Sequence, residues 1–259
     1  MKRNKAIFLF ILWFILGYIF QVQEAEAKPE VHVQPNKIHI SAFFKGQELK
    51  IFGKVPIDWD IAIKIDGSRE EVHLSRKGKV GVLWMNVGTV SIKGAPNFYF
   101  VSTSTNIENL APPELLEKLE LGYKYLSRHL HIESTLPEDK PDFLFDQFVA
   151  LKQKEKLYKV ESETISFGKP EGELKPFSLI LKIPTKISPG EYIVNLYGFK
   201  DGQLVGSLKS FFDVELVGFP AFTRNLAFNH SLIYGILAVV LAIIVGSMMG
   251  FLFGNKGGH

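Results

Sequence analysis

The chain has 259 residues, of which 46% are hydrophobic and 22% are charged, and its formal net charge is +3. It contains no cysteine, which excludes a disulfide scaffold, thiolate metal sites and a cysteine nucleophile. A chain this apolar is not largely disordered. The small net charge argues against a nucleic-acid partner.

The N-terminal 27 residues have the three parts of a secretory signal peptide. Residues 1–5 are basic, Ala6 to Phe20 carry no charge, and Ala25-Glu26-Ala27 forms a small-residue exit. An uncleaved signal anchor is the alternative, but a membrane span needs about 20 apolar residues. We therefore expect residues 1–27 to be a signal peptide, cleaved after Ala27.

The first half of the exported region, residues 28–105, reads as short strands separated by turns. Residues 37–44 and 61–65 alternate or concentrate apolar side chains, and Asp66-Gly67 is typical of a tight turn. The last third, residues 161–218, again predicts strands. Its Ser188-Pro-Gly-Glu-Tyr192 segment is typical of an immunoglobulin-type domain. The expected fold class is mainly β, an immunoglobulin-like β-sandwich, but the sequence leaves open whether the two halves form one sandwich or two.

Residues 106–160 change to helical periodicity and predict a helical insertion between the β halves. Pro112-Pro113 opens a short helix. A second helix follows Pro141, with Asp139 or Asp142 as its cap. The apolar stripe of the second helix is predicted to contain Leu144, Phe145, Phe148, Val149 and Leu151.

Three lysines, Lys152, Lys154 and Lys156, are expected in the last turn of that second helix, where cations complement the helix dipole. They could form an anion-binding edge or a solvated helix end. The sequence favours the solvated end.

The C-terminal end predicts a transmembrane helix over residues 231–254, preceded by a juxtamembrane linker at 219–230. Residues 231–254 contain no charged residue, and the apolar run 232–253 is about 33 Å long as a helix. With the signal peptide exporting residues 28–230, the span would leave residues 255–259 as a cytoplasmic tail. We therefore expect a single-pass protein of the inner (cytoplasmic) membrane, with its N-terminal domain periplasmic.

One face of the predicted span consists of small residues at intervals of four. Small residues at this spacing let a second helix approach closely in lipid, although glycine is common in membrane helices generally. Besides the lipid bilayer, the expected partner is a second copy or a multi-span protein. The residues of this helix-packing face are Ala238, Ala242, Gly246, Gly250 and Gly254.

No catalytic motif is present in the sequence, so we expect neither an enzyme nor a cofactor. His129 and His131 form an H-x-H pair that would point the same way on a strand and could share a metal with His73 or His32. The alternative is two surface histidines, which the absence of thiolate ligands favours.

A compact basic cluster, Arg76, Lys77 and Lys79, is expected between two strands and could bind an oxyanion such as sulfite or sulfate. The alternative is a charged strand edge that prevents aggregation. Trp59 and Trp84 are expected in the core, because both lie within apolar strands.

The order of several short motifs resembles the uncharacterised, single-span transmembrane protein family first described from alphaproteobacteria. The resemblance runs from about Phe52 to Phe253. It rests on Arg76-Lys77-x-x-Val80-x-x-Leu83-Trp84-Met85-Asn86, Pro96-Asn-Phe-Tyr99, Ser102-Thr103-Ser104, Asn109-Leu-Ala-Pro-Pro113, Phe148-x-x-Leu151-Lys152, Leu157-Tyr158, Pro189-Gly-x-Tyr192, Asp201-Gly202, Val217-Gly218-Phe219 and Tyr234-Gly235.

The resemblance implies an exported β-rich region with a C-terminal span, no assigned activity and no catalytic residues to transfer. It also implies a gene neighbourhood that often includes sulfite-exporter-like permeases of the TauE/SafE type. This chain departs from the family pattern at Met85, where valine is commoner, and in a longer, lysine-rich middle segment.

Two hypotheses follow for function. The first is a non-enzymatic, membrane-anchored periplasmic accessory protein that partners a permease of sulfur oxyanions or another membrane complex. The alternative is a periplasmic anion- or metal-binding module tethered to the inner membrane.

Overall fold

The computed structural model describes residues 28–253 of the chain, and the fold is mainly β, as predicted. The signal peptide over 1–27, Gly254 and the tail lie outside the described residues. The strands are β1 (Glu30–Gln34), β2 (Lys37–Ile40), β3 (Gln47–Pro56), β4 (Asp60–Asp66), β5 (Arg69–Val80), β6 (Leu83–Pro96), β7 (Tyr99–Thr103), β8 (His131–Ser134), β9 (Tyr158–Glu161), β10 (Ser166–Phe167), β11 (Leu174–Ile183), β12 (Gly190–Lys200) and β13 (Gln203–Leu216).

Two sheets form a single sandwich, which answers the question that the sequence left open. One sheet has the order β1-β3-β11-β10, and the other has the order β2-β13-β12-β4-β7-β9. In each sheet a strand from the first half pairs with one from the last third, since β3 pairs with β11 and β4 pairs with β12. Residues 28–105 and 161–218 therefore complete one another.

A single apolar core lies between the sheets. Period-two burial along β3 places Leu49, Ile51 and Val55 inside, and β12 contributes Tyr192 and Leu196 from the facing sheet. Alternation of this kind is what a strand with one buried face requires. The turn between β12 and β13 is short. Its residues Asp201 and Gly202 both have positive φ, which is typical of a tight hairpin turn.

Three strands of the first half, β3, β5 and β6, are long. β3 continues through Gly53 to Pro56, so the glycine does not begin a turn. β5 and β6 form one long hairpin, which turns at Gly81 with φ of 64°. β8 pairs with the middle of β6, giving a third sheet, β5-β6-β8, outside the sandwich.

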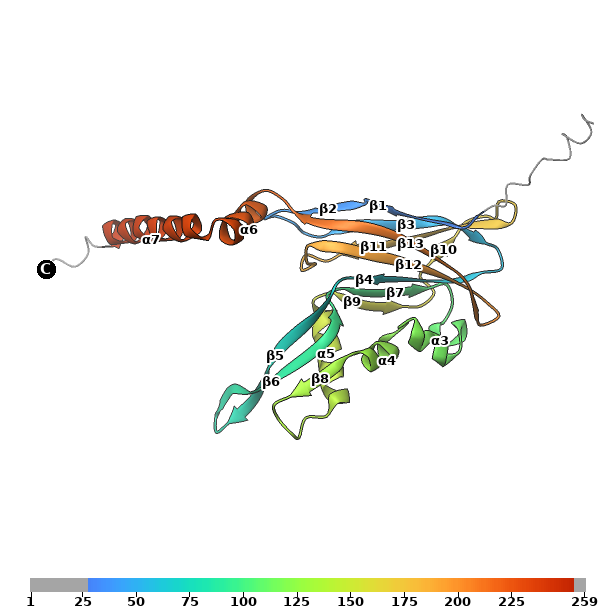
Figure 1. Ribbon diagram of the computed structural model, residues 1–259, viewed down its shortest axis with the longest axis horizontal. Helices are drawn as coiled ribbons and strands as arrows, with labels where there is room; N and C mark the ends of the chain where they lie inside the picture. The colour runs from blue at the N-terminus through green and yellow to red at the C-terminus, as the bar shows by residue number, and fades with distance from the viewer. Residues whose placement is uncertain (1–27, 254–259) are drawn as a thin grey trace, which may run out of the picture.

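The insertion packs beneath the six-stranded sheet beside the long hairpin (Figure 1). It contains four α-helices and one 3₁₀ helix, namely α2 (Ile107–Leu110), α3 (Pro113–Lys118), α4 (Tyr123–Leu126), η1 (Ser127–His129) and α5 (Pro141–Lys154).

Two predictions about helix α5 are wrong. Lys140 is its N-cap residue, and no side chain caps it, because the Asp139 carboxylate instead accepts a hydrogen bond from Ser134 Oγ at 2.8 Å. Leu151 is exposed rather than part of the apolar stripe, and Lys152 is buried in its place. A helix face is decided by its neighbours, and here β9 follows the helix closely enough to cover Lys152.

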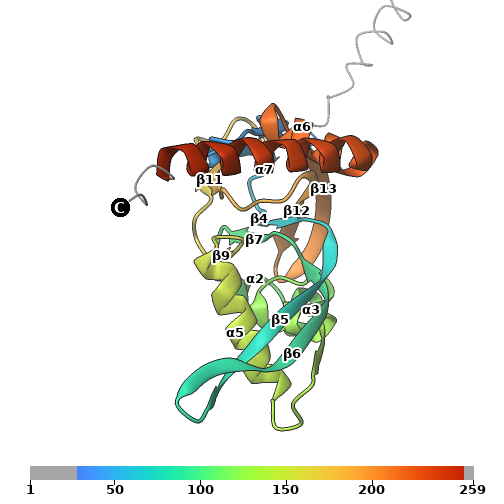
Figure 2. The same ribbon diagram turned by 90° about the vertical axis from the view of Figure 1, so that its left-hand side faces the viewer.

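The chain leaves the sandwich through two consecutive helices (Figures 1 and 2). The segment expected as a juxtamembrane linker is helical, α6 (Phe219–Asn229). After His230, α7 (Ser231–Phe253) has 23 residues, a mean hydropathy of 2.7 and no buried residue, as a membrane-spanning helix requires. This helix confirms that the predicted C-terminal segment is long and apolar enough to be a candidate membrane span.

Candidate functional site

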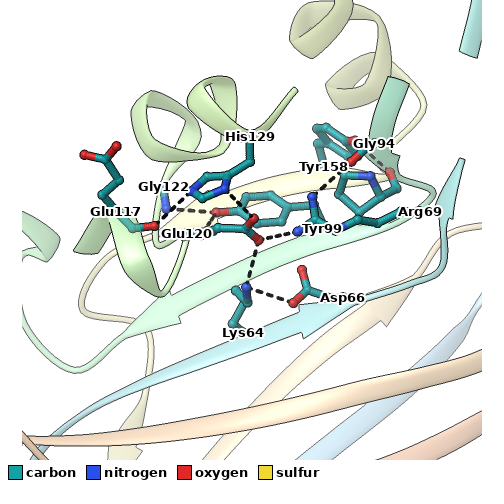
Figure 3. Close-up of polar contacts among 11 residues, drawn as sticks. Lys64, Asp66, Arg69, Gly94, Tyr99, Glu117, Glu120, Gly122, His129 and Tyr158 are labelled. Carbon is teal, nitrogen blue, oxygen red and sulfur yellow. Dashed lines mark hydrogen bonds and ion pairs between the residues drawn. The ribbon is translucent and has the colours of Figure 1, made fainter. Parts of the chain in front are cut away.

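A buried cluster of charged side chains lies where the insertion meets the six-stranded sheet (Figure 3). Lys64 and Asp66 come from β4, two residues apart and therefore on the same face of the strand. Glu120 comes from the loop after α3, and Arg69 from the start of β5. Long-range folding thus gathers four charges that lie on three separate segments.

Lys64 is the centre of this cluster. Its Nζ lies 2.9 Å from Asp66 Oδ2 and 3.2 Å from Glu120 Oε2, and its side chain is only 7% exposed. The Arg69 guanidinium binds the same Glu120 oxygen and donates to the Gly94 carbonyl at 3.0 Å. Two cations and two carboxylates balance one another, which is how buried charges are tolerated.

The environment shifts the pKa values of the cluster in different directions. Burial disfavours the charged forms of Lys64 and Glu120, but the attraction between opposite charges outweighs it. As a result the pKa of Lys64 is raised and that of Glu120 is lowered. Burial dominates at Asp66 and raises its pKa above the ordinary value, against the attraction of Lys64. Its second oxygen, Oδ1, is buried without a hydrogen-bond partner among the described residues.

Tyr99 of β7 fixes the backbone around Glu120. Its hydroxyl donates to the Glu120 carbonyl at 2.5 Å and accepts from the Gly122 N–H at 2.8 Å. Burial raises the pKa of Tyr99 well above its ordinary value, so this phenol stays protonated. His129 closes the outer side, with Nδ1 at 3.5 Å from Glu120 Oε1. The cluster pairs its two cations with two carboxylates, and it ties the insertion to the sandwich.

The predicted metal pair does not have the geometry that was expected of it. His129 ends η1 and His131 begins β8, so the two rings do not share one strand. His131 contacts Glu133 at 3.1 Å, whereas His73 and His32 are paired with other carboxylates at 3.9 and 3.4 Å. Across residues 28–253, no group of three or more histidine or carboxylate side chains could hold a metal ion.

The predicted oxyanion cluster is not brought together either. Arg76, Lys77 and Lys79 lie within one strand, β5, rather than between two strands. Arg76 Nε lies 3.3 Å from Asp139 Oδ1, while Lys77 and Lys79 remain exposed. Since the arginine is paired with a carboxylate, the three cations do not converge on one anion.

The two tryptophans that were expected in the core, Trp59 and Trp84, behave differently from one another. Trp59 is half-buried against Gly198 and Gly206 and packs against the core, but it lies between β3 and β4 rather than within a strand. Trp84 is 72% exposed near the tip of the β5–β6 hairpin, and its assignment to the core is wrong. An apolar strand can be exposed when no second layer covers it.

A lysine-lined groove lies between the C-terminal end of α5, β9 and the end of β11. It has a volume of about 960 Å³, and its floor includes the buried rings of Phe98, Phe100 and Tyr158. Its rim carries two carboxylates, Glu155 and Glu161, and six lysines. These lysines are Lys45, Lys154, Lys156, Lys159, Lys182 and Lys186.

Two of the groove lysines are paired with the two carboxylates. Lys186 Nζ lies 2.7 Å from Glu155 Oε1, and Lys159 Nζ lies 2.6 Å from Glu161 Oε1. Four positive charges are left in excess around an apolar floor, a combination that suits an anion with apolar parts. Of the three lysines that the sequence placed at the helix end, Lys154 and Lys156 line this groove and Lys152 does not.

The family described as "Putative transmembrane protein (Alph_Pro_TM)" matches residues 30–255. The chain belongs to this family. The match spans the sandwich, the insertion and the candidate membrane helix, so it supports a transmembrane protein as a whole. The family resemblance seen in the short motifs is thereby confirmed. No curated protein matches the chain.

Sequence reasoning missed both the buried cluster and most of the groove. A usable signal for the cluster was Lys64 within the apolar run Ile61–Ile65, followed by Asp66 on the same strand face. Nothing local pointed to Glu120, which lies 56 residues beyond Lys64.

Proposed function

We propose that the protein is a non-enzymatic, membrane-anchored accessory protein with a periplasmic β-sandwich, an inner-membrane span and a cytoplasmic C-terminus. The observation that carries this proposal is the direct junction of the folded sandwich, through α6, to the wholly exposed apolar helix α7. The basic N-terminal residues and the lysine after the span support the orientation. The charge-balanced cluster supports a structural role for the buried polar groups.

We infer further that the sandwich is immunoglobulin-like. The orders β1-β3-β11-β10 and β13-β12-β4 correspond to the A-B-E-D and G-F-C sheets of that architecture. Tyr192, at the start of β12, donates a hydrogen bond to the Ser188 carbonyl at 2.6 Å, as in a tyrosine corner. Immunoglobulin-like domains commonly serve recognition, which fits an accessory role by analogy.

The proposed partner is a multi-span membrane protein, with a permease of sulfur oxyanions as the class that the family resemblance implies. The small residues Ala238, Ala242, Gly246 and Gly250 follow at four-residue intervals along α7, which makes no helix–helix contact along this face. Close helix approach in lipid uses faces of this kind. Self-association through the same face is the other outcome.

Gentle detergent extraction followed by identification of co-purifying membrane proteins tests the partner. Gly246→Leu should abolish recovery of the partner, because a large side chain prevents close helix approach. Ile244→Leu, on the opposite helix face, should leave recovery unchanged. Recovery of the wild-type protein as a lone monomer, with and without chemical crosslinking in the intact membrane, would contradict the proposal.

A second candidate function, an anion-binding module, is favoured by the lysine-lined groove rather than by the hairpin cations. Calorimetry of the full-length protein with sulfate and with sulfite measures it directly. The double variant Lys154→Gln, Lys182→Gln should weaken binding, whereas Lys77→Gln, Lys79→Gln should not. Binding should also weaken with added salt, since exposed charges are screened. An absence of heat with both anions would remove this candidate.

A further inference from the structure

The β5–β6 hairpin extends beyond every other element that supports it. β8 pairs with β6 only from Val90 to Lys93, and the neighbouring loop reaches no farther along the hairpin than Gly88, where Thr135 and Leu136 lie close. Beyond that point the two strands pair only with each other. We call residues 80–87 the hairpin tip.

The hairpin tip is apolar and exposed. It contains six exposed apolar side chains and no charged residue, and Val82 at the turn is 87% exposed. An exposed apolar surface of this kind usually marks a contact site. The six side chains are those of Val80, Val82, Leu83, Trp84, Met85 and Val87.

Apolar side chains occupy both faces of the tip. Leu83, Trp84 and Met85 are consecutive on β6, and consecutive side chains of a strand point to opposite faces. Docking of a sheet on a protein partner covers one face and leaves the other in water. Immersion in lipid removes both faces from water at once, so this pattern favours a bilayer over a protein surface.

The tip projects toward the side of the molecule from which α7 departs. In Figure 1 the hairpin points downward and toward the left, the direction in which α7 extends, and in Figure 2 α7 crosses the top of the molecule while the hairpin points toward its lower end. In α6, next to that helix, Phe219 and Phe222 are exposed as well. The bilayer that receives α7 is therefore the apolar phase on the side toward which the tip extends.

The charges behind the tip suit a lipid surface. Between residues 72 and 92 there is no Asp or Glu, while Lys77 and Lys79 are exposed. Arg76 is held by Asp139, so these two lysines are the free cations of the hairpin. Lysines near a membrane surface are attracted to anionic headgroups, and tryptophan favours the interface between headgroups and acyl chains.

We propose that the hairpin tip inserts into the headgroup region of the bilayer that α7 spans, with Lys77 and Lys79 at anionic headgroups. The sandwich is then attached at two points, which fixes its orientation and the height of the lysine-lined groove above the membrane. The inference depends on α7 being in the membrane. It does not depend on the partner or the anion proposed above.

The absence of cysteine from the natural chain allows a clean test with single labels. Leu83→Cys carries a fluorophore in the full-length protein, reconstituted in vesicles of phosphatidylcholine and phosphatidylglycerol that contain nitroxide-labelled lipid. Ile180→Cys is the matched control, because Ile180 is an exposed apolar residue of β11, in the four-stranded sheet of the sandwich. Leu237→Cys in α7 verifies reconstitution.

Strong quenching at position 83, together with weak quenching at 180, is the expected result. Equal quenching at 83 and 180, with position 237 quenched normally, would overturn the proposal. It would then leave a protein partner as the occupant of the tip. Because the tip lies outside the core, Leu83→Cys should retain the wild-type circular dichroism spectrum.

The contribution of the lysines is tested in the same vesicles. Lys77→Gln and Lys79→Gln should each lower the ratio of inserted to free tip about fivefold when phosphatidylglycerol is present, and much less in pure phosphatidylcholine. Lys50→Gln, an exposed lysine of β3, is the control and should change nothing. Quenching that is insensitive to both hairpin substitutions and to phosphatidylglycerol would refute the headgroup contact.

Discussion

The hydroxyl of Tyr99 donates a hydrogen bond to the carbonyl oxygen of Glu120 at a distance of 2.5 Å. The same hydroxyl accepts from the Gly122 N–H, and both of these loop residues have positive φ, 53° at Glu120 and 109° at Gly122. Non-glycine residues adopt this conformation only where the surroundings hold it. One phenol of the sheet therefore positions the carboxylate that binds Lys64.

Tyr99→Phe should lower the free energy of unfolding by about 2 kcal/mol, because a buried carbonyl and a buried N–H both lose their partner. Tyr158→Phe is the matched comparison, since the Tyr158 hydroxyl has one partner, the Pro96 carbonyl at 2.7 Å. It should cost about 1 kcal/mol. Urea unfolding followed by circular dichroism, on the full chain in detergent, measures both. A Tyr99 variant no weaker than the Tyr158 variant would contradict the role assigned to this phenol.

Glu120→Gln should be more destabilising, by about 3 kcal/mol, because it leaves Lys64 with a single carboxylate in a buried site. Partial exposure of Arg69 keeps the loss at the low end for a broken buried pair. Glu117→Gln is the control: Glu117 pairs with Arg128 at the surface, where an ion pair contributes less than about 1 kcal/mol. Similar losses in the two variants would show that the buried position of Glu120 adds nothing.

The stability gap between wild type and Glu120→Gln should depend on pH. The folded state holds the pKa of Glu120 below its ordinary value of 4.5, so its stabilising contribution is complete above that pH. The gap should close as the pH falls through the lowered pKa, because protonated Glu120 then resembles glutamine. Unfolding curves at a series of acidic pH values test this.

Ionisation of Asp66 should have the opposite effect on the free energy of unfolding over the same acidic pH range. Its folded pKa is raised above 3.8, so ionisation of Asp66 opposes folding as the pH rises through that window. Subtracting the Glu120→Gln curve from the wild-type curve largely removes this shared contribution. A gap that widened toward low pH would refute the assignment.

Gly206→Ala should destabilise the sandwich by about 2 kcal/mol through overpacking. A Cβ there would lie 2.3 Å from the Trp59 ring, and one at Gly198 would lie 2.0 Å from it. The cost should fall markedly in a Trp59→Leu background, because the ring that causes the clash is gone. A double-mutant cycle of unfolding free energies measures this coupling. Simple additivity of the two substitutions would show that the ring is not the obstacle.

Lys152→Glu should destabilise the protein by about 3 kcal/mol, because it buries a carboxylate beside Glu70. The Lys152 Nζ lies 3.7 Å from Glu70 Oε1 and 5.6 Å from the centre of the Phe148 ring. Lys154→Glu, two residues away and exposed, should change stability by less than about 0.5 kcal/mol. Lys152→Met should be far milder than Lys152→Glu. Equal effects of Lys152→Glu and Lys154→Glu would contradict the burial of Lys152.

Features that depend on a short stretch of chain were predictable. The length and the lack of charge of α7 can be read directly from its apolar run, and the strands expected over residues 161–218 include β11, from Leu174 to Ile183. The short helix after Pro112 was foreseen for the same reason, since a proline at a helix start acts locally.

Side-chain environment was predicted less well, as Trp84 and Lys152 show. Trp84 lies in an apolar strand, yet its hairpin extends beyond the second layer that would have covered it. Lys152 lies at a helix end, yet Tyr158 and Phe148 enclose it. Periodicity shows which residues share a face, whereas burial depends on what packs against that face.

The sequence by itself determined the candidate membrane helix, the β-rich character of the region before it and the absence of any thiol chemistry, because hydropathy, period and composition act over neighbouring residues. Only the tertiary structure decided that the two β halves share one core and that Lys64 pairs with Glu120. It also decided that Arg76 pairs with Asp139 rather than forming one cluster with Lys77 and Lys79. These contacts join residues dozens of positions apart. Their free energy exists only once the sheets and the insertion are packed, so no local pattern encodes them.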